Sequence, residues 1–595
     1  MKQEIIDRLA ALRKAMADAD INATIIPKTD PHQSEYLADH WQVIRWLTGF
    51  TGSAATVVVT RDEALFWTDS RYFLQAAEQL DGTTIKLMKD GLPETPSINE
   101  YLLDHLAEGD TIGIDGMLFS INATRELAAV FNPRGINLAV DFAPFDILWT
   151  SRPELPANPI FIHDIKYAGE SAPDKMRRIL ANVEMQGARS TFICDLAEIA
   201  WTLNIRCNDV DCNPVATAFL MVAPGQSTLF INTLKLTDET RRYLTDCNVD
   251  IKGYDAAAAY LSSLPADACV LLSASQAAGA FMTLLGDRAV IGTSPVAMLK
   301  ACKNDVQIDG VRHAMVRDGV ALVKSFMEIE ERMEKGIPTT EMDIADILFK
   351  YRSAQPLFYT ISFDTIAGYG PHGAIVHYSA TPESNSTLRP DNLLLVDSGA
   401  SYLDGTTDIT RTITLGNTTA EQRRDFTLVM KGHIALATAI YPVGTRGAQL
   451  DVLARQYLWK QGLSYLHGTG HGVGHFLNVH EGPQSIRLND TLAPMTPGMI
   501  TSNEPGLYRS GEHGIRCENL VLTVKAMTTE FGEFLKFETL TLFPFDLRLF
   551  DTTIMTDEEI AWVNSYHAIV WEHLSPALND SEKTWLRAKT AELKR

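Results

Sequence analysis

The segment LLLVDSGASYLDGTTDITRTITL, residues 393–415, predicts two β-strands joined by a tight turn. An apolar run ends at Asp397, Asp404-Gly405 is a turn dipeptide, and a second run rich in β-branched residues follows. If the segment folds as a hairpin, Asp397 and Asp408 lie side by side. Two like charges in a poorly hydrated site repel, so one carboxyl group must take up a proton or a cation must bind. Taken singly, both aspartates could also be turn residues at strand ends.

A second pair of carboxylates repeats this arrangement. Glu504 lies in MITSNEPGLY and Glu518 in GIRCENLVLTV, two strand patterns linked by RSGEHG. A glutamate flanked by Ile, Cys, Leu and Val is expected to be buried, and buried glutamates need a partner. An ion pair with Arg516 or Arg509 could satisfy one of them. It does not account for four carboxylates in two matched hairpins.

Residues 467–483, HGTGHGVGHFLNVHEGP, bring four histidines close together. His467, His471 and His475 have the spacing of one helix face. The glycines between them argue against a helix, because each Gly costs a helix interior about 1 kcal/mol relative to Ala. We therefore predict a loop, and the zincin motif H-E-x-x-H is not present in it.

Four carboxylates with one histidine offer mainly oxygen ligands and one nitrogen. Such a set suits divalent ions such as Mn²⁺, Co²⁺ or Zn²⁺ and is too rich for one catalytic ion. The residues therefore predict a two-metal site, in which bridging carboxylates hold both ions and activate a shared water.

The composition is that of a globular protein with an acidic surface. The chain has 595 residues, 46% of them hydrophobic, and a formal net charge of -22. The length predicts three or four domains, and the charge argues against nucleic acid and anionic membranes as partners. The N-terminal segment has no apolar run of the length of a signal-peptide core, and no stretch of the sequence has the apolar length of a membrane span. Seven scattered cysteines fit a reducing compartment, so we expect a cytoplasmic enzyme.

The pattern of predicted helices and strands changes along the chain. Strand and helix patterns alternate first, including a helix over SINEYLLDHLAEG from a serine start to a glycine stop, and Pro153, Pro156 and Pro159 then mark a linker. A second α/β stretch weakly echoes the first. Long helices and β-rich runs follow, which predict helices covering a curved antiparallel sheet, and a helical tail without evident chemistry. The predicted regions are 1–155, 156–304, 305–545 and 546–595.

The motifs VDSGA, TTDITRT, GTGHGVGH, SNEPG and GIRCEN, in this order, resemble those of the pita-bread metallopeptidases. The resemblance is closer to the three-domain Xaa-Pro aminopeptidases. It covers nearly all of the chain, since DPHQSEYLADHW, FTGSAATVVVT and LFWTDSRYFLQA are similar to that family's first domain and NDVDCNPV to its second. It implies an α+β fold with two N-terminal creatinase-like α/β domains, a C-terminal pita-bread catalytic domain with a helical extension, and a homodimer.

The resemblance also implies the metal ligands. Two divalent ions are expected, Mn²⁺ ahead of Zn²⁺ or Co²⁺. Their ligands would be Asp397 for one ion, His471 and Glu504 for the other, and Asp408 and Glu518 for both.

Further residues would contact the substrate. His377, His467 and His480 match family histidines that position the proline side and hydrogen-bond the scissile carbonyl or leaving group. Arg516 would orient Glu518 or substrate, or form a structural ion pair. His475 matches no family histidine and receives no role.

The implied activity is release of the N-terminal residue from peptides with proline in the second position. A hydroxide that bridges the metal ions would attack the Xaa-Pro bond, and Glu504 would move the proton to the proline nitrogen. Three alternatives remain. A prolidase-like dipeptidase shares the ligands but usually lacks the extra domain, creatinase uses the fold without metal, and non-catalytic pita-bread binding modules have eroded ligand sets.

Overall fold

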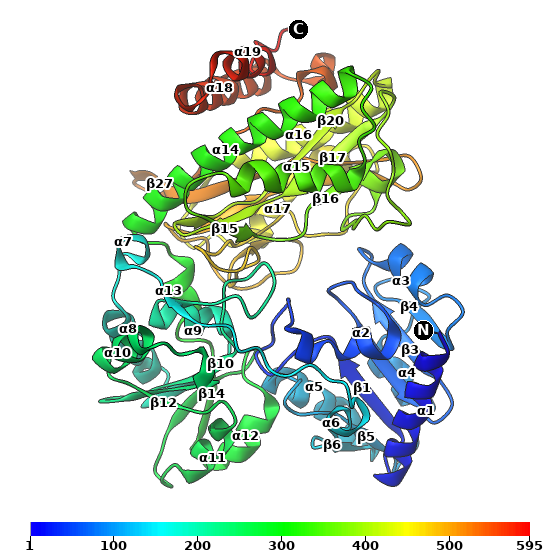
Figure 1. Cartoon of the computed structure of the whole chain (residues 1–595), viewed down its shortest axis with the longest axis vertical. Helices are drawn as coiled ribbons and strands as arrows, with labels where there is room; N and C mark the ends of the chain where they lie inside the picture. The colour runs from blue at the N-terminus through cyan, green and yellow to red at the C-terminus, as the bar shows by residue number, and fades with distance from the viewer. Residues whose placement is uncertain (1) are drawn as a thin grey trace. The chain divides into compact units, whose positions relative to one another are not determined.

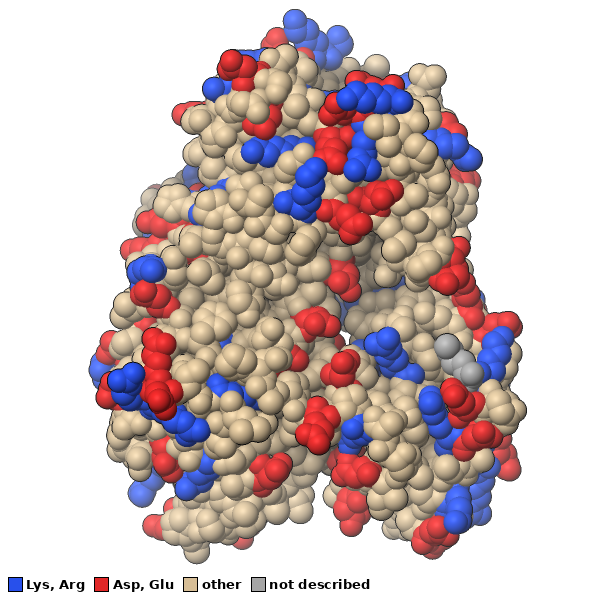
Figure 2. Space-filling model, in the orientation of Figure 1, with Lys and Arg blue, Asp and Glu red and all other residues tan. Residues whose placement is uncertain are grey.

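The computed structural model describes residues 2–595. They form two compact units, one of Met1–His163 with Glu170–Val296 and one of Asp164–Gly169 with Ala297–Arg595 (Figure 1). In the described part of the chain, helices are too short or too polar to cross a membrane. On the face shown in Figure 2, acidic and basic side chains are interspersed.

The first unit begins with a six-stranded sheet in the order β4-β3-β2-β1-β5-β6. Strand β2 pairs antiparallel with β1 and β3, and the other pairings are parallel. The strands are β1 Ala23–Pro27, β2 Thr56–Thr60, β3 Ala64–Thr68, β4 Ile85–Lys89, β5 Thr111–Gly113 and β6 Asn137–Ala139. The helices are α1 Lys2–Asp18, α2 Val43–Thr48, α3 Phe73–Gln79, α4 Ile98–His105, α5 Ile121–Phe131 and α6 Phe145–Leu148.

Helices cover both faces of this sheet, as side chains of one strand show. Val57 and Val59 belong to the core that contains Leu9 of α1, whereas Val58 belongs to the core that contains Leu102 of α4. Since successive side chains of a strand point to opposite faces, a strand buried on both faces is continuously apolar.

A second six-stranded sheet, ordered β12-β11-β10-β8-β13-β14, repeats the first strand for strand. Strand β10 pairs antiparallel with β8 and β11, and the other pairings are parallel, as in the first sheet. The weak sequence echo thus corresponds to a shared topology. The strands are β8 Ser190–Ile193, β10 Ala218–Val222, β11 Ser227–Ile231, β12 Val249–Lys252, β13 Val270–Ser273 and β14 Ala289–Gly292, and β7 Phe161–Ile162 pairs with β9 Ile205–Arg206. The helices are α8 Ala172–Met185, α9 Leu196–Leu203, α10 Asp238–Asp246, α11 Ala256–Ser263 and α12 Gly279–Leu285.

One expected helix end is wrong. Ser97 caps α4 in a capping box with Glu100, as the serine start predicts, but the helix ends at His105 and Leu106 is extended. The side chain of Asp110 accepts a hydrogen bond from the amide of Ala107 at 2.8 Å, which offers the backbone an alternative to a further helical turn.

The second unit consists of antiparallel strands covered by long helices. Its sheets are β15-β18-β19, β16-β17-β20, β21-β28-β27-β24, β22-β23 and β25-β26. The strands are β15 Phe358–Ile361, β16 Ile366–Tyr369, β17 Leu393–Ser398, β18 Ala400–Tyr402, β19 Gly405–Thr406, β20 Ile409–Thr414, β21 Ile440–Pro442, β22 Gly470–His471, β23 Ser485–Ile486, β24 Ile500–Asn503, β25 Gly506–Arg509, β26 His513–Arg516, β27 Asn519–Thr529 and β28 Gly532–Thr539.

Capping boxes open two of the long helices of this unit. Thr340 and Thr419 form capping boxes with Asp343 and Gln422, respectively. Figure 1 shows α14, α15 and α16 running alongside the strands, and the C-terminal pair α18 and α19 beyond them. The helices are α7 Ile165–Ala168, α13 Ala297–Ala301, α14 Asp305–Glu334, α15 Glu341–Ser353, α16 Ala420–Ala437, α17 Gly447–Trp459, α18 Asp557–Leu574 and α19 Asp580–Lys589.

Candidate metal centre and active site

The hairpin predicted over residues 393–415 brings the first two carboxylates together. Strands β17 and β20 pair antiparallel, with Asp397 opposite Thr410 and Ser398 opposite Ile409. Asp408 immediately precedes β20, so it lies at the same end of the strand pair as Asp397. Both aspartates are buried.

The second carboxylate pair joins the first through Thr410. Glu504 lies between β24 and β25, and Glu518 lies between β26 and β27, in two connected antiparallel pairs. The amide of Glu518 donates to the carbonyl of Thr410 at 3.1 Å, and the Thr410 hydroxyl donates to Oε2 of Glu518 at 2.8 Å. Thr410 was not singled out from the sequence, although its place two residues after Asp408 puts it on the same strand face.

The glycine-rich segment adds one imidazole to these carboxylates. Gly470 lies so close to β24 that a Cβ there would stand 2.0 Å from the carbonyl oxygen of Ser502. The next residue, His471, donates its amide to the Ser502 hydroxyl at 2.9 Å. Its Nε2 lies 3.4 Å from Asp408 Oδ2 and 3.6 Å from Glu504 Oε1. The expected loop is present, with only the two-residue strand β22 inside it.

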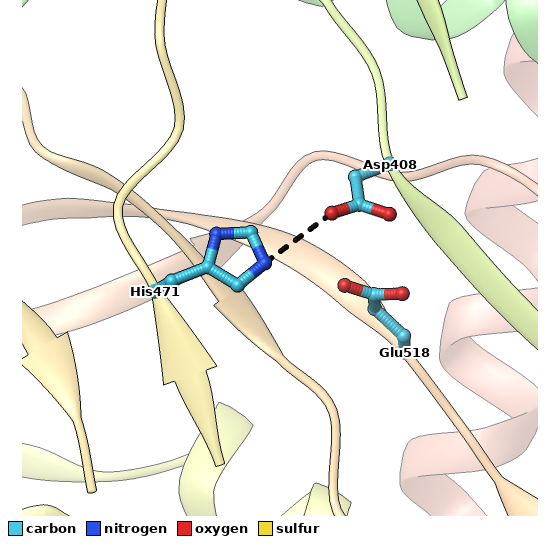
Figure 3. A group of neighbouring side chains, drawn as sticks. All are labelled: Asp408, His471 and Glu518. Carbon is cyan, nitrogen blue, oxygen red and sulfur yellow. Dashed lines mark ion pairs between the residues drawn. The ribbon is translucent and has the colours of Figure 1, made fainter. Parts of the chain in front are cut away.

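Nε2 of His471 is the ring nitrogen that can bind metal. Nδ1 lies 2.9 Å from the carbonyl oxygen of Gly472, and because a carbonyl only accepts, Nδ1 donates this hydrogen bond. Figure 3 shows the imidazole and the carboxylates of Asp408 and Glu518 directed toward a common point. One donor atom from each of the three lies within 4.8 Å of the others.

The donor set fits divalent metal. Oδ1 of Asp397 is buried without a hydrogen-bond partner. Burial and the charges of Asp408 and Asp397 raise the pKa of Glu518 well above its usual range. Burial also raises the pKa of Glu504 to about 7. Carboxylates crowded in this way are costly without counter-charge, and bound cations would supply it.

Arg516 has a partner that the sequence did not indicate. It was expected to orient Glu518 or substrate, or to form a structural ion pair. The structure shows an ion pair, in which the guanidinium group donates to Oδ2 of Asp397 at 2.7 Å. It also donates to the hydroxyl of Tyr508 at 2.8 Å, and that hydroxyl lies 2.8 Å from Nε2 of His467. Because Nδ1 of His467 faces the carbonyl of Gly468 at 2.7 Å, Nδ1 carries the proton and Nε2 accepts from Tyr508.

Tyr508 was missed in the sequence. Strand alternation from Glu504 places it on the site face, and this periodicity could have identified it.

One further predicted histidine, His480, packs against His471. The ring of His480 stands perpendicular to that of His471, with the centroids 4.4 Å apart. His377 is half-buried on the loop after the short helix η5 Gly370–Ala374. The helix η5 before that loop packs on β26, since a Cβ on Gly514 would stand 1.7 Å from the carbonyl oxygen of Gly373. His475 is buried, and within residues 2–595 it does not belong to the ligand-forming group around His471.

Comparison with known families gives the class of the protein. Two segments match the Creatinase/Prolidase N-terminal domain, a third matches Metallopeptidase family M24, and the end matches the C-terminal region of peptidase M24. The matched residues are 8–145, 151–307, 309–525 and 533–593. The fold and the carboxylate-histidine site are thus those of a metallopeptidase with creatinase-type N-terminal domains.

Relatives and a solved structure resemble the chain over its whole length. It is 40% identical to Aminopeptidase P2 of Arabidopsis thaliana, with 100% of this chain and 89% of that protein covered. It is also 40% identical to the Probable Xaa-Pro aminopeptidase P of Coprinopsis cinerea, with 98% and 97% covered. The crystal structure of X-prolyl aminopeptidase from Caenorhabditis elegans, described as a cytosolic enzyme with a di-nuclear active site, superposes with a TM-score of 0.94 at 35% identity and 99% coverage of both chains. The chain belongs to metallopeptidase family M24, in its aminopeptidase P group.

Proposed function

We propose that this protein is a Xaa-Pro aminopeptidase, which releases the N-terminal residue from peptides that carry proline in the second position. The observation that carries the proposal is the convergence of Asp408, His471 and Glu518, whose donor atoms lie within 4.8 Å of one another. Full-length similarity to aminopeptidases P supports the substrate class.

We assign the two ions to five residues. Asp397 would hold one ion, His471 and Glu504 the other, and Asp408 and Glu518 both. Oxygen-rich ligands with one imidazole favour Mn²⁺, with Co²⁺ and Zn²⁺ as alternatives. When bound, the pair of ions supplies hydroxide near neutral pH and polarises the scissile carbonyl.

Glu504 is suited to transfer the proton. Its Oε1 lies 3.6 Å from Nε2 of His471, within the cluster where the attacking water would be held, so the carboxylate is within reach of that water's proton. In the proposed reaction, Glu504 accepts the proton of the attacking water and passes it to the proline nitrogen, which becomes the leaving amine.

The neighbouring groups hold and orient the reactants. His480, next to His471, can hydrogen-bond the scissile carbonyl or the leaving nitrogen. Both ring nitrogens of His467 have intramolecular partners, so it would contact the proline side through its ring. His377 would line the same side of the site. Arg516 acts on Asp397, by fixing which of its oxygens faces the ions.

The organisation of the molecule in the cell is part of the proposal. We propose a cytoplasmic homodimer acting on peptides. The cytosolic relative supports the location, and the net charge of -22 argues against nucleic acid and anionic membranes as partners. We also propose four domains: creatinase-like 1–155 and 156–304, pita-bread 305–545 and helical 546–595. The separate family matches support this division.

The function is tested by comparing Ala-Pro-Ala, Ala-Ala-Ala and Ala-Pro with metal-stripped protein, before and after addition of Mn²⁺, Co²⁺ or Zn²⁺. We expect metal-restored release of alanine from Ala-Pro-Ala alone. Cleavage of Ala-Pro alone would replace the assignment with a dipeptidase. Equal cleavage of both tripeptides would remove the proline specificity, and no cleavage with any ion would contradict the enzymatic function.

A further inference from the structure

A buried arginine connects the C-terminal helix α18 to the back of the predicted metal site. Arg411 lies on β20, three residues after Asp408, and is 2% exposed. Thr410 donates to the carboxylate of Glu518, so its side of the strand is the site face. Since neighbouring side chains on a strand point in opposite directions, Arg411 is directed away from the site.

Glu518 is held by the same two residues of β20. The Glu518 amide donates to the carbonyl of Thr410 at 3.1 Å, and Nη1 of Arg411 donates to the carbonyl of Glu518 at 2.5 Å. The Thr410 hydroxyl binds the carboxylate at 2.8 Å. These three hydrogen bonds fix Glu518 on both sides of its Cα and at its side chain, and Arg411 supplies one of them.

The hydrogen bonds of Arg411 all go to uncharged groups. Its guanidinium group lies over the ring of Phe545 at 4.0 Å. A buried guanidinium without a carboxylate depends on such acceptors, because each unsatisfied N–H would carry its full desolvation cost. The acceptors are the carbonyls of Thr410, Glu518, Phe543 and Pro544, the side-chain oxygen of Asn519 and the hydroxyl of Tyr566.

Tyr566 of α18 fixes both the arginine and the segment that surrounds it. Its hydroxyl accepts from Nη2 of Arg411 at 2.9 Å and lies 2.9 Å from the carbonyls of Thr541 and Phe543. The adjacent His567 accepts from the amide of Phe545 at 3.1 Å. Helix α18 therefore holds in place the chain segment that supplies two of the arginine's carbonyl acceptors.

We propose that Tyr566 is a positioning residue for the metal centre. It keeps Arg411 on the carbonyl of Glu518 and so maintains the direction of the Glu518 carboxylate toward the ions. The inference rests on the proposed function, because it takes Glu518 as a metal ligand. It gives the C-terminal extension a role in the site, although Tyr566 acts through Arg411 and does not touch substrate or metal.

The test compares full-length, metal-stripped Tyr566→Phe and Val570→Ala by calorimetric titration with Mn²⁺ and by melting without metal. Val570 is buried on the same helix and serves as the control, because its truncation leaves a cavity in the helix packing. We expect Tyr566→Phe to weaken Mn²⁺ binding about 10-fold, as loss of a group behind a ligand commonly does. Val570→Ala should lower the melting temperature and leave Mn²⁺ affinity unchanged.

A second variant keeps the test decisive if Tyr566→Phe folds poorly. Arg411→Lys retains the charge but loses the planar fork, so it should weaken Mn²⁺ binding as well. Unchanged affinity in both variants overturns the proposal. Equal losses of Mn²⁺ affinity in Tyr566→Phe and Val570→Ala also overturn it, because they would reflect general destabilisation. A wild-type protein that takes up no Mn²⁺ would instead contradict the proposed function, and the wild-type titration shows this separately.

Discussion

Arg516 binds one oxygen of Asp397 and leaves the other available. Its Nη2 and Nε lie 2.7 and 3.2 Å from Oδ2, whereas Oδ1 is buried without a hydrogen bond. The arginine thereby fixes the rotation of the carboxylate and presents Oδ1 to the predicted metal ion. Of the roles expected for Arg516, the structure shows the ion pair, and its partner lies 119 positions earlier in the chain.

Replacement of Arg516 by lysine should therefore impair catalysis. A lysine retains the charge, but a single ammonium group cannot bind Asp397 and Tyr508 with the geometry of the planar fork. We expect kcat/KM for Ala-Pro-Ala to fall by about 10- to 100-fold. Arg509→Lys is the control, since Arg509 pairs with Asp425 instead. Equal activity of Arg516→Lys and wild type would show that the Asp397 contact is dispensable.

Removal of one crowded carboxylate should stabilise the metal-free protein. The raised pKa of Glu518 means that its charged form is disfavoured in the folded state, so at neutral pH this group lowers the free energy of unfolding. Glu518→Gln removes that penalty and keeps an oxygen for the Thr410 hydroxyl. We expect a higher melting temperature without metal and a smaller rise on adding Mn²⁺ than in wild type, where saturation at 100 times Kd contributes about 2.7 kcal/mol.

Differential scanning fluorimetry measures both effects of Glu518→Gln. The exposed Glu512 lies on the same hairpin, so Glu512→Gln should change neither value. A metal-free Glu518→Gln protein that melts below wild type would contradict the electrostatic account.

The loop that carries His377 should depend on Glu341. This buried carboxylate accepts from Nδ1 of His372 at 2.8 Å and from the hydroxyl of Tyr378 at 2.9 Å, as well as from two backbone amides. A glutamine offers one oxygen for these donors, so Glu341→Gln should loosen the segment next to His377. We expect KM for Ala-Pro-Ala to rise several-fold while Mn²⁺ affinity is retained.

A cap variant on the same helix separates this effect from simple destabilisation. Asp343→Asn weakens the capping box of α15, in which the Asp343 carboxylate accepts from the amide of Thr340 at 2.7 Å, without touching the loop contacts. It should lower the melting temperature and leave KM unchanged. If both variants raise KM equally, Glu341 has no specific role in the loop.

Lys175 should make stability depend on pH in the alkaline range. Burial, with the nearby charge of Arg206, lowers its pKa from 10.5 to about 7. Between these values the unfolded chain binds a proton that the folded protein does not, so this group's contribution makes the free energy of unfolding rise with pH. The free energy of unfolding of Lys175→Met should therefore exceed that of the wild type by more at pH 7 than at pH 9.5.

Urea unfolding at the two pH values measures the Lys175 effect. The substitution also removes hydrogen bonds to the carbonyl of Trp201 and to Asn204. That loss lowers the free energy of unfolding of the variant at both pH values, so it does not produce a difference between them. A difference between variant and wild type that does not change with pH would contradict the lowered pKa.

The sequence predicted those parts of the site that depend on local pattern. Asp397 and Asp408 lie on either side of one tight turn, so the antiparallel pairing of β17 with β20 places both at the same end of the strand pair. Ser97, the predicted start of α4, likewise acts only three residues along the chain, as a helix cap. Such short-range relationships leave a signal in composition and spacing.

Long-range partners left no such signal. The Arg411–Tyr566 contact joins residues 155 positions apart, and its existence depends on how α18 packs on the sheet. The early end of α4 depends on the side chain of Asp110, which competes for one backbone amide. In both cases the deciding group is polar and common, and only its position in the folded chain gives it a role.

The matching strand orders of the two sheets in the first unit bear on the history of the chain. The same succession of antiparallel and parallel neighbours in both is what duplication of one ancestral gene segment would produce. What the copies still share is which positions are buried, as the apolar runs of β2 and β10 illustrate, while the individual side chains have diverged. A search for the origin of this architecture should therefore look for a lone ancestral unit with that strand order.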